Sequence, residues 1–500
     1  MVSREPIPNI VESAMIRGSY DLVVVGSGFG SLFYLRECLG HLPRTARVAL
    51  LERGAYLPHA RQLALRSNSA DPEDPDRPTS ADRYYRRLEG EKPWNFTIGL
   101  GGGTLCWWGQ APRLHPSDFG MRRLYGRGED WPISYDDLEP HYCAAEEIIG
   151  IAGDSDRVGP FRRSRPYPLP AFRGSGIDMA LRERDPMQLA LPAARDSIGA
   201  LRAQCCAHGE CRLCPQDAKF TALNGLPAVL EDARISILTG ANVLALELEA
   251  GHARRVVFER RGRRQTVSGD HVVLGANAIC NPAILQRSGL GHPELGRGIA
   301  EQMGANVEVQ LAAHSGVDGG TAATGQNIRL LDGAHRRAHA AAAYYFDNRW
   351  KHHGLRLERG RHLNTLNLMV IAEALRSERN FVEVPEDWDA LPVIHHATHG
   401  AYAEDGLRAA LRAVPEIFAG LGLERVSEPV ARPSEAHVQC TTPAGTDPGR
   451  SIVDGDLLHH RVRNLSVVGT SVFPTAPAGN PSLTAAAWSL RAARRLFGAG

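Results

Sequence analysis

The sequence opens with a short apolar segment that ends in glycines. Residues 20–25 (YDLVVV) are rich in valine, and the glycine-containing stretch GSGFG follows them. A short apolar run bounded by a turn is typical of a buried parallel strand. We predict a helix over residues 31–39 and a second strand over residues 47–51, with Glu52 at its end.

Similar apolar segments recur in the middle and near the end of the sequence. Residues 271–275 and 464–469 predict strands, residues 482–497 predict a helix, and another helix is expected to begin near Asn281. The segments between them are less regular, and some alternate between apolar and polar residues. We therefore predict an α/β protein in which a Rossmann-like, dinucleotide-binding domain is assembled from discontinuous segments. An inserted α+β domain with a mostly antiparallel sheet is expected to bind the substrate.

This pattern gives a provisional division of the chain. Residues 18–115, 225–310 and 437–500 are assigned to the dinucleotide-binding domain, and residues 116–224 and 311–436 to the substrate domain. Residues 66–83 are polar and rich in proline, so we expect a loop there that serves as a mobile cover.

Composition narrows the class of protein. The net charge of +1 gives no reason to expect a nucleic-acid partner or an acidic membrane surface. We find no signal-peptide core in the first twenty residues and no run of eighteen apolar residues, so we expect a cytoplasmic protein without a membrane span. The odd count of 9 cysteines favours reduced thiols. Lysine is confined to Lys92, Lys219 and Lys351, a bias that we attribute to codon usage.

The opening glycines form a candidate dinucleotide site. Gly26, Gly28 and Ser31 follow the G-x-G-x-x-G spacing, with serine in the last position. Gly26 permits a tight turn, Gly28 allows the backbone to approach a pyrophosphate, and Ser31 is small enough for close packing of helix on strand. Glu52 can accept hydrogen bonds from ribose hydroxyls. These features do not distinguish NAD from FAD.

A second glycine-rich stretch favours FAD. Residues 99–119 (GLGGGTLCWWGQAPRLHPSDF) contain three consecutive glycines, whose amides can face a flavin or a phosphate. Together with the opening glycines, this stretch resembles the glucose–methanol–choline (GMC) oxidoreductase family, which binds FAD. Residues 275–291, 437–454 and 464–496 are similar to later signature blocks of that family. Besides Gly26, Gly28, Ser31 and Glu52, the cofactor residues expected from the resemblance are Gly102, Gly103, Thr104, Val243, Gly469, Pro481 and Thr484.

The same resemblance implies a catalytic pair, His437 and Asn480. In this family a histidine of the penultimate block and a histidine or asparagine of the last block face the flavin. A neutral imidazole can take the proton of an alcohol while a hydride leaves for the flavin. Asn480 can orient the same hydroxyl without competing as a base, and Pro481 should keep its backbone extended. Residues 440–444 (CTTPA) depart from the family's usual Gly-Thr-x-Arg-Met, which changes the expected lining of the substrate pocket.

Four cysteines lie close together in the sequence. Cys205 and Cys206 are adjacent, and Cys211 and Cys214 form a C-x-x-C pair, a spacing seen in metal sites. The segment resembles the cysteine-rich part of bacterial flavin dehydrogenases, some of which hold an iron–sulfur cluster there. The alternatives are structural thiols or a local disulfide.

The function expected from these features is FAD-dependent oxidation of a CH–OH group. Likeness to pyranose oxidase and bacterial sugar dehydrogenases favours a sugar, glycoside or aminocyclitol as substrate. Oxygen or another molecule accepts the electrons. The alternatives are a redox-neutral, FAD-containing lyase and the flavin subunit of an electron-transfer complex. Cys106 is either a flavin-linked residue or a small buried thiol, and Trp94, Trp107 and Trp108 either stack on a sugar or pack in the core.

Overall fold

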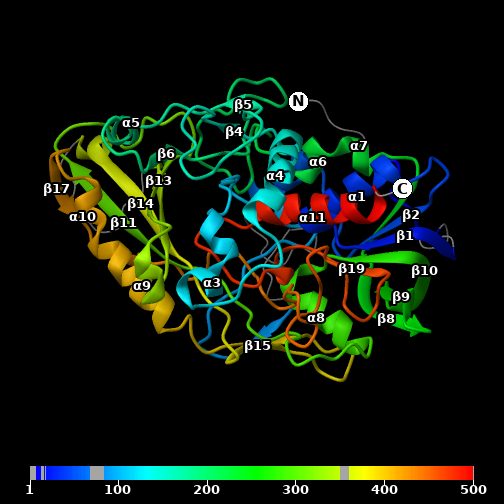
Figure 1. The fold of residues 1–500 in the computed structure, drawn as a ribbon. Helices are drawn as coiled ribbons and strands as arrows, with labels where there is room; N and C mark the ends of the chain where they lie inside the picture. The colour runs from blue at the N-terminus through cyan, green and yellow to red at the C-terminus, as the bar shows by residue number, and fades with distance from the viewer. Residues whose placement is uncertain (1–6, 13–15, 17, 68–83, 350–359, 499–500) are drawn as a thin grey trace.

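Two seven-stranded sheets form the framework of the protein (Figure 1). The computed structural model describes residues 7–12, 16, 18–67, 84–349 and 360–498. The first sheet lies on the right in Figure 1 and is built from both ends and the middle of the chain. The second lies on the left, with helices along its outer side.

The first sheet has the strand order β7-β2-β1-β10-β9-β8, with β19 also paired to β10. Strands β7, β2, β1, β10 and β19 pair in parallel, whereas β8, β9 and the start of β10 form antiparallel pairs. The strands are β1 (Ser19–Val25), β2 (Val48–Glu52), β7 (Ile235–Thr239), β8 (Asn242–Glu249), β9 (His252–Arg260), β10 (Arg263–Leu274) and β19 (Leu465–Val467). The predicted Rossmann-like sheet from discontinuous segments is thereby confirmed.

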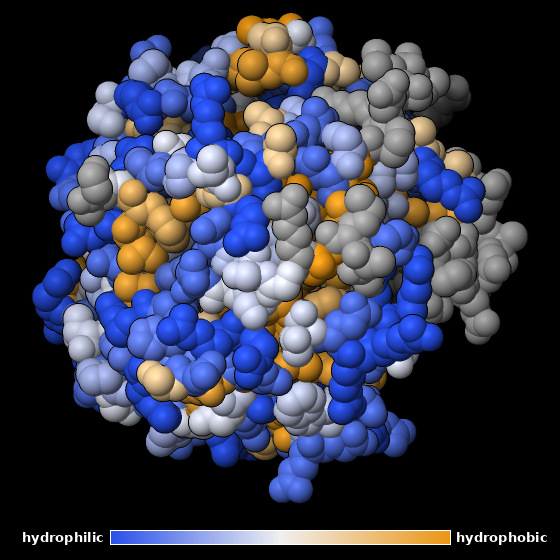
Figure 2. All heavy atoms as spheres, turned by 90° about the vertical axis from the view of Figure 1, so that its right-hand side faces the viewer, coloured by the Kyte–Doolittle hydropathy of each residue, from blue (hydrophilic) through white to orange (hydrophobic). Residues whose placement is uncertain are grey.

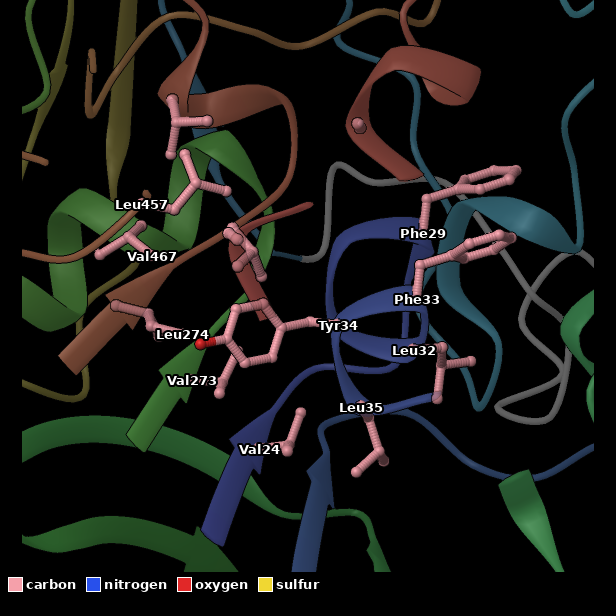
Figure 3. Close-up of a cluster of buried hydrophobic side chains, with 14 of the residues drawn as sticks. Val24, Phe29, Leu32, Phe33, Tyr34, Leu35, Val273, Leu274, Leu457 and Val467 are labelled. Atoms are coloured by element: carbon pink, nitrogen blue, oxygen red, sulfur yellow. The ribbon is translucent and has the colours of Figure 1, made fainter. Parts of the chain in front are cut away.

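Three helices pack around this sheet. Helix α1 (Phe29–His41) begins directly after Gly28, two residues earlier than predicted, and α11 covers the predicted residues (Ser482–Phe497). Both pack against each other, and α4 (Tyr135–Ile149) packs on α11. Figure 3 shows Tyr34 pointing from α1 towards Val273 and Leu274, while Phe29 and Phe33 point to the other side of the helix. Burial of such side chains stabilises the fold by about 1.5–3 kcal/mol each.

Helix α8 (Asn277–Arg287) begins earlier than the sequence predicted, with Pro282 inside it. Proline has no amide proton, so the carbonyl four residues before it loses its helical partner. Here that carbonyl belongs to Ala278, and it accepts a hydrogen bond of 2.6 Å from Oγ1 of Thr441 instead. A partner from a distant segment thus allows the helix to continue through Pro282.

The second sheet is antiparallel throughout, as predicted for the substrate domain. Its order is β17-β11-β14-β13-β12-β6, with β18 also paired to β11. The strands are β6 (Gln188–Ala190), β11 (Met303–Leu311), β12 (Ala323–Leu330), β13 (Ala342–Asp347), β14 (Thr365–Ala372), β17 (Leu423–Val426) and β18 (Val430–Ala431). Helices α9 (Ala401–Arg412) and α10 (Val414–Ile417) cover one face, where their apolar residues join the strands in one core.

Short elements complete the fold. These are helices α2 (His59–Ser67), α3 (Met121–Tyr125), α5 (Gly176–Arg182), α6 (Ala222–Gly225) and α7 (Pro227–Leu230), and strands β3 (Arg86–Arg87), β4 (Ala152–Gly153), β5 (Leu169–Pro170), β15 (Asn380–Glu383) and β16 (Val393–His396).

A predicted domain boundary and a predicted loop can be compared with the structure. Strand β11 starts at Met303 and lies wholly in the second sheet, although the predicted boundary assigned residues up to 310 to the cofactor domain. The division of the chain into domains otherwise stays a prediction. Of the loop predicted over residues 66–83, the first two residues end α2, and the rest lie outside the described residues.

The face of the molecule on the right of Figure 1 is largely hydrophilic. Figure 2 shows the face on the right of Figure 1, where apolar side chains appear in separate patches among polar ones. Scattered apolar residues of this kind are normal on a folded protein. Within the part of the chain that the structure describes, no helix combines the length and the apolar character that a membrane span requires.

Two glycines of α1 provide a matched test of its packing. A Cβ atom at Gly30 would lie 2.6 Å from the amide nitrogen of Gly469, whereas at Gly40 it would meet open space. We expect Gly30→Ala to lower the free energy of unfolding by about 1–3 kcal/mol through overpacking. Gly40→Ala should raise it by about 0.4–1 kcal/mol, because alanine restricts the unfolded chain. Urea unfolding followed by circular dichroism measures both, and equal midpoints for the two variants would contradict the packing described here.

Candidate active site

A cavity of about 800 Å³ lies at the carboxyl ends of the parallel strands of the first sheet. Ligands of open α/β sheets bind at this edge, and the volume suits a small-molecule site. The residues that follow each strand form much of the wall: 26–30 after β1, 52–53 at the end of β2, 275–277 after β10 and 468–471 after β19. The rest of the wall includes residues 102–103, 106–108, 434–438 and 480–482.

Glycines allow two backbone segments to meet in this wall. Gly26 has a φ of 82°, and a Cβ atom there would collide with the carbonyl oxygen of Gly275. A Cβ atom on Gly102 would lie 2.9 Å from Cα of Gly28. Gly28 also precedes α1 and offers no side chain to cap it, so the first amides of that helix can bind an anion. The wall therefore suits a pyrophosphate.

Glu52 is buried at the end of β2, with 5% of its surface exposed. Its Oε2 accepts hydrogen bonds from the amide (3.1 Å) and the hydroxyl (2.5 Å) of Ser27, and Oε1 accepts one from the amide of Gly54 (2.8 Å). Burial raises the pKa of Glu52, and these hydrogen bonds oppose the shift. A carboxylate offers about four acceptor positions, so Glu52 can still accept from a ribose hydroxyl.

The structure brings most, but not all, of the predicted cofactor residues to the cavity. Those in its wall are Gly26, Gly28, Glu52, Gly102, Gly103, Val243, Gly469 and Pro481. Ser31, Thr104 and Thr484 lie behind the wall. The hydroxyl of Ser31 donates to the carbonyl of Val25 (3.2 Å), that of Thr484 bonds to the Tyr142 hydroxyl (2.7 Å), and that of Thr104 bonds within its own turn. Their hydroxyls thus support the wall and do not reach the cavity.

His437 lies in the wall on a strained turn. The preceding residue, Ala436, has a φ of 61°, a left-handed conformation that costs of order 1–3 kcal/mol in a non-glycine residue. The amide of His437 donates to Oε1 of Glu301 (2.9 Å), and its Nδ1 lies 3.0 Å from Oε1 of Gln302. Burial lowers the pKa of His437 to about 4, so the imidazole is neutral at pH 7.

Asn480 lies in the same wall, immediately before Pro481 and α11. Its Oδ1 is buried and has no hydrogen-bond partner among the described residues. Leaving a buried oxygen without a hydrogen bond costs free energy, so such an atom is typical of a place where a ligand binds. The structure therefore brings His437 and Asn480, from separate segments, to one cavity.

Gln302 connects these two residues. Its Nε2 donates to the carbonyls of Pro477 (2.7 Å) and Gly479 (3.2 Å), just before Asn480, while its Oε1 faces His437. The side chain is 2% exposed. Gln302 belongs to none of the sequence motifs, so the sequence alone did not point to it.

Two of the lysines lie close to residues of the cavity wall. Lys92 forms a salt bridge with the buried Glu301 and lies 3.5 Å from the centre of the Trp94 ring. Lys219 is buried and donates to three carbonyls between 2.8 and 3.0 Å away, those of Leu105, Trp107 and Arg212. Two of the few lysines of this arginine-rich chain thus lie beside the cavity, and Lys351 falls outside the described residues.

The four clustered cysteines do not converge on a common point. Sγ of Cys205 lies 3.3 Å from the hydroxyl of Thr321, and Sγ of Cys211 accepts from Arg195 at 3.3 Å. Cys206 is exposed, and all four thiols are free. Within the described ranges, no three histidine, cysteine, aspartate or glutamate side chains are grouped so as to hold a metal ion. The structure gives no support to the iron–sulfur cluster, and it contains no local disulfide.

The three candidate tryptophans and Cys106 lie partly in the core and partly in the cavity wall. Trp94 is fully buried, and Trp107 donates from its ring to the carbonyl of Phe220 (2.8 Å) at the edge of the cavity. Trp108 lies in the wall, and the guanidinium carbon of Arg349 lies over its ring, 4.1 Å from the centre of the ring. Cys106 also lies in the wall, with its thiol 3.8 Å from the carbonyl oxygen of Gly103.

The residues present fit FAD. The glycine contacts leave the backbone open to a pyrophosphate, Glu52 has acceptor capacity for a ribose, and Asn480 presents an unpaired oxygen to the cavity. These three features lie in the wall of one cavity.

Comparisons with known proteins point to one family. Two profiles described as GMC oxidoreductase match residues 186–312 and 376–489. The large subunit of fructose dehydrogenase from Gluconobacter japonicus is 25% identical, over 95% of this chain and 97% of its own length. The 6'''-hydroxyparomomycin C oxidase of Streptomyces lividus is 28% identical, over 81% of this chain and 79% of its own.

Solved structures show the same fold. Pyridoxine 4-oxidase from Mesorbium loti superposes with a TM-score of 0.67 at 19% identity, covering 96% of this chain and 100% of the other. Formate oxidase from Aspergillus oryzae gives a TM-score of 0.68 at 14% identity, with 96% and 98% covered. The chain belongs to the GMC oxidoreductase family and is an FAD-dependent oxidoreductase.

Proposed function

We propose that this enzyme oxidises a CH–OH group of a sugar, glycoside or aminocyclitol, with His437 as the general base. One observation carries the proposal: His437 and Asn480 line the same cavity, and each offers a polar atom to it. Among the described residues, Nδ1 of the His437 ring has a hydrogen-bond partner, Nε2 has none, and Oδ1 of Asn480 has none.

The chemistry assigned to these residues follows from their charge. An alcohol that becomes a carbonyl loses a proton from oxygen and a hydride from carbon, and bound FAD supplies the hydride acceptor. The neutral His437 takes the proton at Nε2. Asn480, which cannot act as a base, holds the hydroxyl in place for that transfer.

Two observations support a sugar-like substrate. The curated relatives include fructose dehydrogenase, 6'''-hydroxyparomomycin C oxidase and paromamine 6'-oxidase, whose names indicate sugars or aminoglycosides. The cavity wall also combines an aromatic ring, Trp108, with polar side chains such as Gln110, Asn95 and Ser434. Such a mixture suits a substrate that has apolar ring faces and many hydroxyls.

Anaerobic mixing with a panel of sugars, glycosides and aminocyclitols tests the reaction class. Substrate should bleach the flavin, and reoxidation after oxygen is admitted then shows whether oxygen is the acceptor. One relative is named a large subunit, so slow reoxidation would favour electron transfer to a partner. A flavin that no alcohol bleaches would instead favour the redox-neutral lyase.

Replacing the proposed base should disable the reduction step. We expect His437→Ala to slow flavin reduction by about 10²–10⁴-fold, the usual contribution of a general base. The matched control is His271→Asn. His271 is also a partly buried histidine whose pKa burial lowers to about 4, but its ring lies 3.0 Å from the Ser466 hydroxyl between β10 and β19, and it is not in the cavity wall. Stopped-flow absorbance measures both, and equal rates for the two variants would overturn the assignment.

The pH dependence should report the neutral imidazole. Because burial lowers the pKa of His437 to about 4, the base is deprotonated above that value and lost below it. The rate of flavin reduction should therefore be constant from about pH 6 to 8 and fall as the pH drops through about 4. Enzyme kept at pH 7 and mixed rapidly into acidic substrate solution avoids slow unfolding. A rate that falls already between pH 7 and 6 would contradict a base with so low a pKa.

A further inference from the structure

We propose that Gln302 is a positioning residue that fixes the tautomer of His437 and the location of Asn480 with a single amide. The inference rests on the proposed function, in which these two residues handle the substrate hydroxyl. It adds a residue that keeps His437 in one tautomer and Asn480 in one position.

The surroundings of Gln302 determine which way its amide faces. Nε2 lies 2.7 Å from the carbonyl oxygen of Pro477 and 3.2 Å from that of Gly479, and carbonyls only accept hydrogen bonds. The opposite orientation would place the amide oxygen against two other oxygens. Gln439 also donates from its Nε2 to Oε1 of Gln302 (3.3 Å), which agrees with the same orientation.

This orientation dictates the tautomer of His437. Oε1 of Gln302 can only accept, and it lies 3.0 Å from Nδ1 of His437. A neutral imidazole carries one proton, so that proton resides on Nδ1. Nε2 then holds the lone pair that a general base needs.

The same amide anchors the segment that presents Asn480. Pro477 and Gly479, whose carbonyls it binds, lie three residues and one residue before Asn480. Because Gln302 is almost fully buried, water cannot readily replace these hydrogen bonds. A shift of the amide would therefore move both sides of the site at once.

Charged groups surround His437, but within the described residues the hydrogen-bond partner of Nδ1 is the uncharged Gln302. Glu301 accepts from the backbone amide of His437 and pairs with Lys92, while Arg432 donates to Glu435 at 2.6 Å. The ring nitrogen instead meets a neutral amide. A carboxylate in that place would stabilise the imidazolium and raise the pKa of His437.

Two substitutions separate the tasks of the amide. Gln302→Glu keeps an acceptor for Nδ1–H but adds a charge, so we expect the acidic fall in flavin reduction to move to higher pH by about 1–3 units. Gln302→Leu removes both tasks and should slow flavin reduction by about 10–100-fold, as is common when a supporting hydrogen bond to a functional histidine is lost.

The control is Gln326→Leu. Gln326 is a buried glutamine on β12 of the second sheet, and among the described residues its side chain donates to the carbonyl of Ala190 (3.4 Å) and forms no hydrogen bond with His437 or residues 477–479. It reports the cost of losing a buried amide, and its pH profile should match that of the parent enzyme. If Gln302→Leu does not fold with FAD bound, the pH profile of Gln302→Glu still decides the matter.

A direct readout does not depend on turnover. In protein labelled with ¹⁵N-histidine, the nitrogen resonances distinguish the two neutral tautomers, and the His437 signals are those absent from His437→Ala. We expect the Nδ1–H form in the parent and a loss of that preference in Gln302→Leu. An Nε2–H form in the parent, or Gln302 variants that match Gln326→Leu in both spectrum and pH profile, would overturn the inference.

If His437→Ala also reduces its flavin normally, the proposed function fails with it; if only the Gln302 variants behave normally, the function stands.

Discussion

Backbone segments from distant parts of the chain touch one another at the carboxyl edge of the first sheet. The turn after β1 meets the end of β10 at Gly26 and Gly275, helix α1 meets the end of β19 at Gly30, and the triple-glycine segment meets Gly28. A single Cβ atom at Gly26, Gly30 or Gly102 would collide with main-chain atoms, which cannot move aside as a side chain can. The cavity retains its shape because these contacts hold its walls together, so the position of every other functional group depends on them.

The groups that hold His437 come from the segment that leads into the second sheet. Glu301 and Gln302 lie just before β11, and from there they bind the amide and the ring of His437. His437 follows a left-handed residue, a conformation that persists only when the surroundings enforce it. The first sheet thus forms much of the cofactor cavity. The residues just before β11 orient His437 and anchor the segment that carries Asn480.

Sequence patterns were informative where local order decides the structure and silent where distant contacts decide it. The strands around β1 and the full length of α11 were predicted because continuous apolar runs must be buried. The motif spacing placed Ser31 near the cofactor, but a motif position does not tell which way a side chain points, and its hydroxyl bonds to the backbone. Gln302 could not be found, because its role arises only when His437 and residues 477–479 fold against it.

The strand order has a consequence for biosynthesis. Strand β19 pairs with β10, and α11 packs against α1, so the last described strand and helix complete walls that the first ones begin. While a ribosome is still making residues 465–497, the nascent chain has the glycine turn but neither Asn480 nor the wall beside it. Stable capture of the flavin therefore has to await release of that segment, and a product truncated before it would lack one wall of the cavity.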